Sequence, residues 1–303
     1  MKKVLILLAF VTIAGMARAQ NVIASTELEA QNVNEVRIEG SFCDVYVERG
    51  DRNYVTGVIK GKGEKGDYTF DTEITGSTLV VKVIRKDRRS WKGYNLSESK
   101  IELTIRDGVK LDIDNSSGDI YVTGLSTDDS KIEATSGDIT LKRIQADIEV
   151  ETSSGDISID QLTGALEIQS TSGDQRIYNT DGDIDSRASS GDITISNFNG
   201  KMEMETTSGD VDIRGGIGIL NVQTTSGNIE GDDIDLKGDA YFRASSGDVE
   251  IDFLNDLSEM SFDLTATSGN LSVGNKSGEK KLYIDRGGYK VTGVTSSGNQ
   301  EYD

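Results

Sequence analysis

Ten acidic or amide side chains recur at one position of a repeated motif, and their oxygen atoms could bind a metal ion. Stacked carboxylates repel one another, so a hard cation such as calcium is one candidate ligand. The alternative is an Asx turn, in which each side chain accepts a main-chain N–H of its own corner. Asparagine in three copies favours the turn, so we expect no cofactor and keep calcium as the alternative. The ten residues are Asp119, Asp138, Asp156, Asp174, Asp192, Asp210, Asn228, Asp248, Asn270 and Asn299.

A second set of carboxylates lies six residues before a recurring glycine in four consecutive copies: Glu149, Glu167, Asp185 and Glu203. Paired carboxylates at a suitable separation hydrolyse glycosidic bonds, and some β-helical proteins cleave polysaccharides. The copies here lack the insertions that would build a groove around a substrate. A solvated charged face is the simpler interpretation, and binding of cations or of a basic partner is the sharper alternative.

Serine precedes each of the ten glycines, and serine can act as a nucleophile when a neighbouring base activates it. The sequence contains no histidine, which is the commonest general base. A residue present in every copy is better explained as a small, stacked corner residue. The sequence therefore indicates a protein that is not an enzyme, with a polysaccharide-active enzyme of the β-helix type as the alternative.

One segment combines positive charge with aromatic rings in an acidic chain. It runs from Arg85 to Tyr94 and contains the single tryptophan. Arginine, tryptophan and tyrosine are enriched at the centres of protein interfaces. The alternative is a long hairpin tip between two strands. The candidate partner-binding residues are Arg88, Arg89, Trp91 and Tyr94.

The glycines that position these side chains recur at a constant interval. Between Gly137 and Gly227 the interval is 18 residues five times in succession. Apolar and polar residues alternate on both sides of each glycine, which predicts two half-buried strands per repeat. The chain contains no proline, as expected when nearly every main-chain N–H belongs to a strand ladder. The glycines are Gly118, Gly137, Gly155, Gly173, Gly191, Gly209, Gly227, Gly247, Gly269 and Gly298.

Repeats of equal length with identical turns favour a coil that winds once per repeat over an antiparallel meander. We predict an all-β fold, a parallel β-solenoid (single-stranded β-helix) whose two-strand rungs of ~18 residues stack in chain order about 4.8 Å apart. Residues 20–110 lack the motif but alternate like strands, and we expect them to form a β-rich N-terminal cap. The solenoid is expected over residues 111–303, with irregular rungs after Gly247.

The N-terminus has the pattern of a secretory signal peptide. A basic start is followed by an apolar run from Val4 to Met16 and by Ala17-Arg18-Ala19 before Gln20. The run is shorter than the ~20 residues that span a bilayer. Cleavage after Ala19 would remove residues 1–19 and leave no transmembrane segment. We expect an exported protein that is periplasmic, on the cell surface or secreted.

The chain is strongly acidic. Removal of residues 1–19 takes away three positive charges and changes the net charge from −20 to −23. Such a surface repels nucleic acid and anionic lipid, and it could attract cations or basic proteins. For an exported binding protein, we expect an envelope protein or a glycan as the partner. The single cysteine, Cys43, excludes an intrachain disulfide framework, and the oligomeric state stays open.

Three features resemble a known family. They are the signal peptide, the opening Val36–Val45 and the serial Ser-Gly-Asp-Ile/Val corners. Together they are similar to the bacterial "putative adhesin" proteins with β-strand repeats, which include the head-GIN domain, a "putative autotransporter adhesin". The resemblance implies an extracytoplasmic β-helical protein with an adhesin-like or envelope-associated binding or scaffold role, and it implies no catalytic motif. A calcium-stabilised structural module stays a further alternative.

Overall fold

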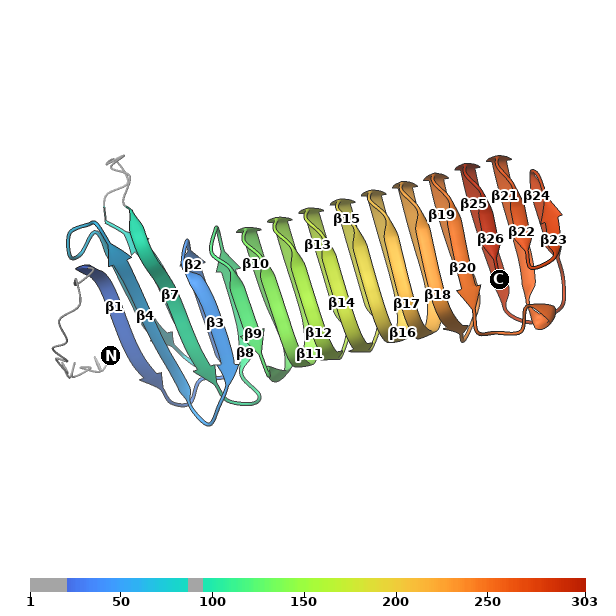
Figure 1. Ribbon diagram of the computed structural model, residues 1–303. Coiled ribbons are helices and arrows are strands. Elements are labelled where there is room, and N and C mark those ends of the chain that lie inside the picture. Colours follow the sequence, from blue (N-terminus) through green and yellow to red (C-terminus); the bar gives the residue numbers. More distant parts are fainter. Residues whose placement is uncertain (1–20, 87–94) are drawn as a thin grey trace.

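The computed structural model describes residues 21–86 and 95–303, which form strands and one short 3₁₀ helix (Figure 1). The N-terminal part contains β1 (Asn21–Ala30), β2 (Glu35–Ser41), β3 (Asp44–Arg49), β4 (Asn53–Gly61), β5 (Tyr68–Thr75), β6 (Thr78–Arg85), β7 (Leu96–Ile105), β8 (Lys110–Asn115) and β9 (Ile120–Thr123). The central part contains β10 (Ser126–Ser136), β11 (Ile139–Ser154), β12 (Ile157–Thr163), β13 (Leu166–Ser172), β14 (Gln175–Asp181), β15 (Ile184–Ser190), β16 (Ile193–Ser208), β17 (Val211–Ser226) and β18 (Ile229–Leu236). The C-terminal part contains β19 (Ala240–Ser246), β20 (Val249–Phe253), the helix η1 (Leu257–Glu259), β21 (Ser261–Ser268), β22 (Leu271–Val273), β23 (Lys276–Gly278), β24 (Lys281–Ile284), β25 (Lys290–Ser297) and β26 (Gln300–Tyr302).

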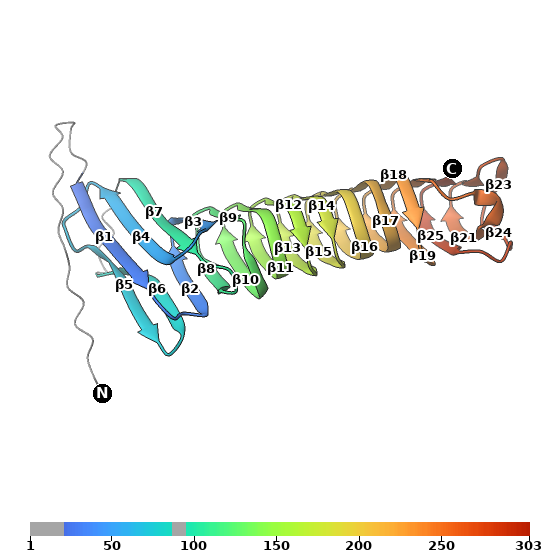
Figure 2. The ribbon, with the colours of Figure 1, turned by 90° about the horizontal axis from the view of Figure 1, so that it is seen from below.

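Strands of successive repeats pair in parallel, with an offset of 18 residues in the centre of the chain. In the pairing of β12 with β14, Ile159 lies opposite Ile177, and in that of β13 with β15, Leu166 lies opposite Ile184. The strands that precede each corner glycine form one face of an elongated stack, and those that follow it form the second face (Figures 1 and 2). The prediction of an all-β, solenoid-like fold is confirmed.

The corner glycines are stacked so closely that a side chain has no room. A Cβ added to Gly173 would lie 2.1 Å from the carbonyl oxygen of Gly155, and one added to Gly155 would lie 2.2 Å from that of Gly137. The φ angle of Gly173 is also positive, at 111°, where other residues are strained. The Gly155 and Gly173 corners are thus stacked as the repeat predicts, and they fix the approach of neighbouring rungs.

The interior between the two faces holds the apolar half of the alternation. Ile139, Ile157 and Ile193 follow the corner in three rungs and are fully buried. The corresponding residue of the rung between the last two is Gln175, which is also buried. Its Oε1 accepts a hydrogen bond from Ser186 Oγ at 2.5 Å, and its Nε2 donates to Ser170 Oγ at 2.9 Å. The two serines satisfy the amide, because an unpaired buried polar group would be costly.

The N-terminal rung does not stack in chain order. Strand β2 pairs in parallel with both β6 and β8, and β3 pairs with both β7 and β9, so residues 35–49 lie between two later segments. Buried Asn115 fixes this arrangement, since its Nδ2 donates to the carbonyl oxygens of Cys43 at 3.0 Å and Gly118 at 2.6 Å. The region expected as a cap is β-rich, but its strands β2, β3, β6 and β7 already belong to the parallel stack.

The C-terminal rung is also inserted out of order, which corrects the expectation of stacking in chain order. Strand β25 pairs in parallel with β19 and with β21, and β26 pairs with β20 and β22. The last residues therefore lie between two earlier rungs. Buried Tyr302 contacts Phe242, Phe253 and Phe262 with ring centroids 6.1, 6.1 and 5.8 Å away, and this aromatic packing holds the inserted rung.

Antiparallel strands lie at both ends of the stack. At the N-terminal end β1 pairs with β4, β4 with β7, and β5 with β6. At the C-terminal end β23 pairs with β22 and β24 with β21. Short or charged edge strands of this kind discourage pairing with another chain, and β24 carries Lys281.

Candidate functional site: the outward columns

The aspartate column forms hydrogen bonds between rungs. Oδ1 of Asp138 accepts the main-chain N–H of Asp156 at 2.9 Å, and Oδ1 of Asp156 accepts that of Asp174 at 3.0 Å. Asparagine does the same, since Oδ1 of Asn228 accepts the N–H of Asp248 at 3.0 Å. The prediction that these side chains accept a main-chain N–H at the corner is confirmed. The prediction that the N–H belongs to the same corner was wrong, because the donor lies in the next rung. The hydrogen bond between rungs therefore does not require a charged side chain, because asparagine forms it as well as aspartate.

Asp156 gives this column a testable pH dependence. The N–H of Asp174 and the Arg176 guanidinium lower the pKa of the Asp156 carboxyl. A lowered folded-state pKa stabilises the protein above the unfolded pKa of about 3.9, and this contribution is lost as the pH falls through the folded value. We expect the thermal midpoint of Asp156→Asn to fall less steeply below about pH 4 than that of the wild type.

The control for this prediction is Asp156→Ala. It removes the acceptor as well as the charge and should cost about 1 kcal/mol at neutral pH. Thermal melts between neutral and strongly acidic pH measure all three proteins. If the thermal midpoints of the wild type and of Asp156→Asn fell equally steeply with decreasing pH, a role for this carboxylate charge would be contradicted.

The predicted acidic stripe forms one continuous column on the first face. Glu149 lies opposite Glu167, Glu167 opposite Asp185, and Asp185 opposite Glu203 in neighbouring strands. An open groove of about 470 Å³ runs along this column, and a second of about 490 Å³ lies beside it. The structure thus brings these four residues together, as the repeat predicts.

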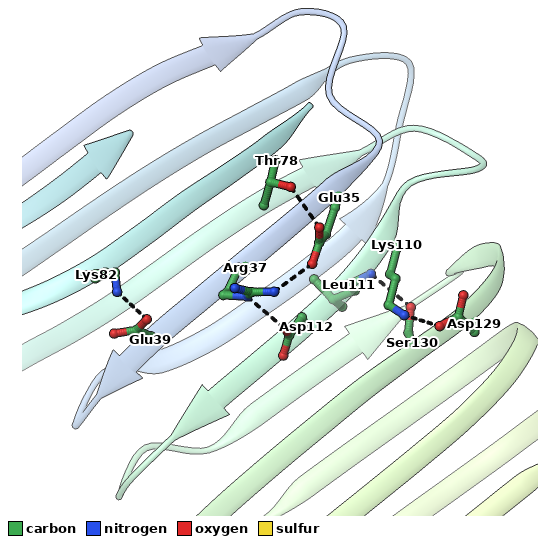
Figure 3. Close-up of polar contacts among 10 residues, drawn as sticks. All are labelled: Glu35, Arg37, Glu39, Thr78, Lys82, Lys110, Leu111, Asp112, Asp129 and Ser130. Atoms are coloured by element: carbon green, nitrogen blue, oxygen red, sulfur yellow. Dashed lines mark hydrogen bonds and ion pairs between the residues drawn. The ribbon is translucent and has the colours of Figure 1, made fainter. Parts of the chain in front are cut away.

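The protein's own cations neutralise much of this stripe. Lys131 Nζ lies 2.6 Å from Glu149, Arg187 2.9 Å from Asp185, and Lys201 3.2 Å from Glu203. The same pattern continues toward the N-terminus, where Arg37 pairs with Asp112 at 2.8 Å among further cross-strand contacts (Figure 3). The sequence predicts a solvated charged face but not these ion pairs. Lys131 lies in the stripe's own column, opposite Glu149, whereas Arg187 and Lys201 lie in the two columns beside it.

The second face carries a different set of carboxylates, which we call the carboxylate band. Asp212 lies opposite Glu230, Glu230 opposite Glu250, and Glu250 opposite Glu301. Within the described residues, an ion pair is found for Asp212 alone among these four, where Arg214 Nε donates to Oδ1 at 3.0 Å. The band therefore keeps most of its negative charge available to a partner.

Sequence reasoning missed the band although part of its signal was present. Asp212, Glu230 and Glu250 each lie three residues after a corner glycine in consecutive copies. Glu301 occupies the same position but reaches the band only because the last rung is inserted beside β20. Chain order alone would place Ser272 there instead.

A family model matches residues 33–214 and 196–301, which together span most of the chain and the whole repeat region. The chain belongs to the Toastrack DUF4097 family. No curated protein matches the sequence.

Several solved structures are similar to this Toastrack chain. A "putative adhesin" from Bacteroides fragilis is 14% identical, and the match covers 95% of this chain and 100% of that one with a TM-score of 0.34. A "putative adhesin" from Parabacteroides distasonis is 9% identical over 91% and 95% of the two chains, with a TM-score of 0.37. A "putative lipid binding protein" from the same species is 14% identical over 91% and 95%, with a TM-score of 0.32. The activities in these names belong to those proteins.

Two sets of residues predicted to be functional in this Toastrack chain lie outside the part that the structure describes. The candidate residues Arg88, Arg89, Trp91 and Tyr94 lie outside the described residues, as does the signal-peptide segment 1–19. Within residues 21–86 and 95–303, no group of three or more potential ligands is arranged to hold a metal ion. In the same part of the chain, no helix has the length and apolar character needed to cross a bilayer.

Proposed function

We propose that this protein is an exported, non-enzymatic binding or scaffold protein of the cell envelope that engages a cationic partner through the second face of its stack. The carboxylate band supports this proposal, because Glu230, Glu250 and Glu301 lie in adjacent strands without an ion-pair partner among the described residues. Asp232 and Asp252 lie beside the band and add to its charge. The absence of histidine from the sequence supports a role other than acid–base catalysis.

A rigid row of like charges suits recognition of a basic protein segment. The ladder holds the main chains of these residues in a fixed row about 4.8 Å apart, and the field of their carboxylates steers a positively charged partner toward the face. Such contacts set association rate and salt dependence more than they set final affinity. We therefore expect binding that weakens strongly as the salt concentration rises.

Titration with a fluorescent oligolysine peptide tests the band. The triple variant Glu230→Gln, Glu250→Gln, Glu301→Gln should weaken binding about tenfold or more at low salt. The matched control is Glu149→Gln, Glu167→Gln, Glu203→Gln, which removes the same formal charge from the internally paired stripe and should change affinity less than about threefold. Equal losses in both variants would show that net charge alone attracts the peptide, and the proposal would fail.

Export rests on the N-terminal pattern of residues 1–19. We expect N-terminal sequencing of the mature protein to begin at Gln20, whereas a cytosolic protein that retains residues 1–19 would contradict export.

The segment with Arg88, Arg89, Trp91 and Tyr94 is proposed as a second contact for an envelope partner, on the basis of its composition. Loss of affinity for that partner in Trp91→Ala would support this contact.

A further inference from the structure

An aromatic stack stands on the second face, far from the carboxylate band. The rings of Tyr46 and Tyr121 are stacked, with centroids 5.0 Å apart and planes inclined by 8°. The Tyr121 hydroxyl also donates to Asp119 Oδ2 at 3.2 Å, which fixes the ring. Because Tyr46 covers one face of the Tyr121 ring, the other face is directed along the stack toward the next strand.

The next two strands carry short side chains at this position. Thr140 lies opposite Tyr121, Ser158 opposite Thr140, and Arg176 opposite Ser158. Two hydroxyl-bearing residues therefore separate a long aromatic side chain from a long cationic one. Three strand spacings of about 4.8 Å give about 14 Å between the main chains of β9 and β14.

The far end of this gap is as firmly held as the aromatic end. Arg176 donates to Asp156 Oδ2 at 2.9 Å and to Asp174 Oδ2 at 2.7 Å. Two exposed residues flank the gap. Asp138 lies on the side of the corner glycines, and Lys142 lies on the other side. Within the described residues neither of these two takes part in an ion pair, so both can bond to a ligand.

We propose that this gap, the tyrosine bay (Tyr121, Asp138, Thr140, Lys142, Ser158 and Arg176), binds a sugar ring of a neutral glycan. One face of a pyranose carries C–H groups that pack against an aromatic face. Its hydroxyls can bond to the threonine and serine hydroxyls below, and to the carboxylate and ammonium at the sides. The bay contains both charge signs, which suits an uncharged polar ligand, and the net charge of −20 disfavours nucleic acid. This site is independent of the carboxylate band.

Titration with chitotriose, cellotriose, maltotriose and mannotriose, followed by amide NMR, tests the bay. At least one trisaccharide should shift the amide signals of Thr140 and Ser158. Tyr121→Ala should weaken that binding about tenfold or more. Tyr121→Phe, which keeps the ring, and Tyr241→Ala, which removes a tyrosine from the first face, should change affinity less than about twofold.

A second variant separates loss of the ligand site from loss of folding. Thr140→Arg leaves the tyrosine stack in place and fills the bay, so it should block binding while the thermal midpoint stays near that of the wild type. Failure of all four trisaccharides to bind at millimolar concentration would overturn the proposal. So would binding that both Tyr121→Ala and Thr140→Arg leave unchanged, whatever the result with oligolysine.

Discussion

Gly173→Ala should destabilise the centre of the stack by about 3 kcal/mol or more. The new methyl group would meet the Gly155 carbonyl oxygen at 2.1 Å, so the two rungs must separate. The positive φ adds roughly 1–2 kcal/mol of strain, and the overlap adds roughly 1–3 kcal/mol. Because a stack can open rung by rung, amide hydrogen exchange at Ile159 and Ile177 should rise before global unfolding.

Gly108→Ala is the matched control for this prediction. Gly108 has a φ of 74°, but an added Cβ meets no atom within 4 Å. It therefore keeps the strain and lacks the overlap, and it should cost only about 1–2 kcal/mol. Urea midpoints and hydrogen exchange compare the two variants. Equal costs would mean that contact between rungs does not limit the residue at position 173.

Truncation after Tyr289 should unfold much more than the residues that it removes. Strands β25 and β26 lie between the pair β19/β20 and the pair β21/β22, so their loss removes a parallel neighbour from each pair. Strands β21 and β22 would keep only their short antiparallel partners β24 and β23. Hydrogen-exchange protection over residues 261–273 should fall to that of an exposed loop.

The same measurement contains its own control. Residues 157–190 have complete neighbours on both sides and should keep their protection in the truncated protein. Persistent protection over residues 261–273 would contradict the inserted position of the last rung. Uniform loss along the whole chain would instead indicate one cooperative unit, in which the ends support the centre.

The periodic part of the fold could be predicted because it depends on local residues that recur. The glycine column, the buried isoleucines such as Ile157 and the acceptor at Asp156 follow from one repeated pattern of turn and alternation. A second recurring feature, a positive φ angle, could not be predicted from residue type. Residues with positive φ recur every 18 residues on the second face, and no single residue type marks them. They are Arg143, Gln161, Asn179, Asn197, Gly215 and Asp233.

The order of the terminal rungs could not be predicted from the pattern. Each rung offers nearly the same ladder to its neighbours, so the choice of neighbour depends on side chains specific to the ends. Gln300 donates to the Thr265 carbonyl oxygen at 2.8 Å and thereby selects β21 as a neighbour of the last rung. For the same reason Glu301 could not be assigned to the carboxylate band, since Glu250 and Glu301 are distant in sequence.

Tyr121, Thr140, Ser158 and Arg176 of the tyrosine bay lie in the same column of the second face as the carboxylate band. Register connects Thr140 to Glu230 through Ser158, Arg176, Thr194 and Asp212, which is five strand spacings or about 24 Å. Because the ladder holds that span constant, a two-headed ligand gains avidity only if its linker bridges it, and a shorter linker leaves each head with its single-site affinity.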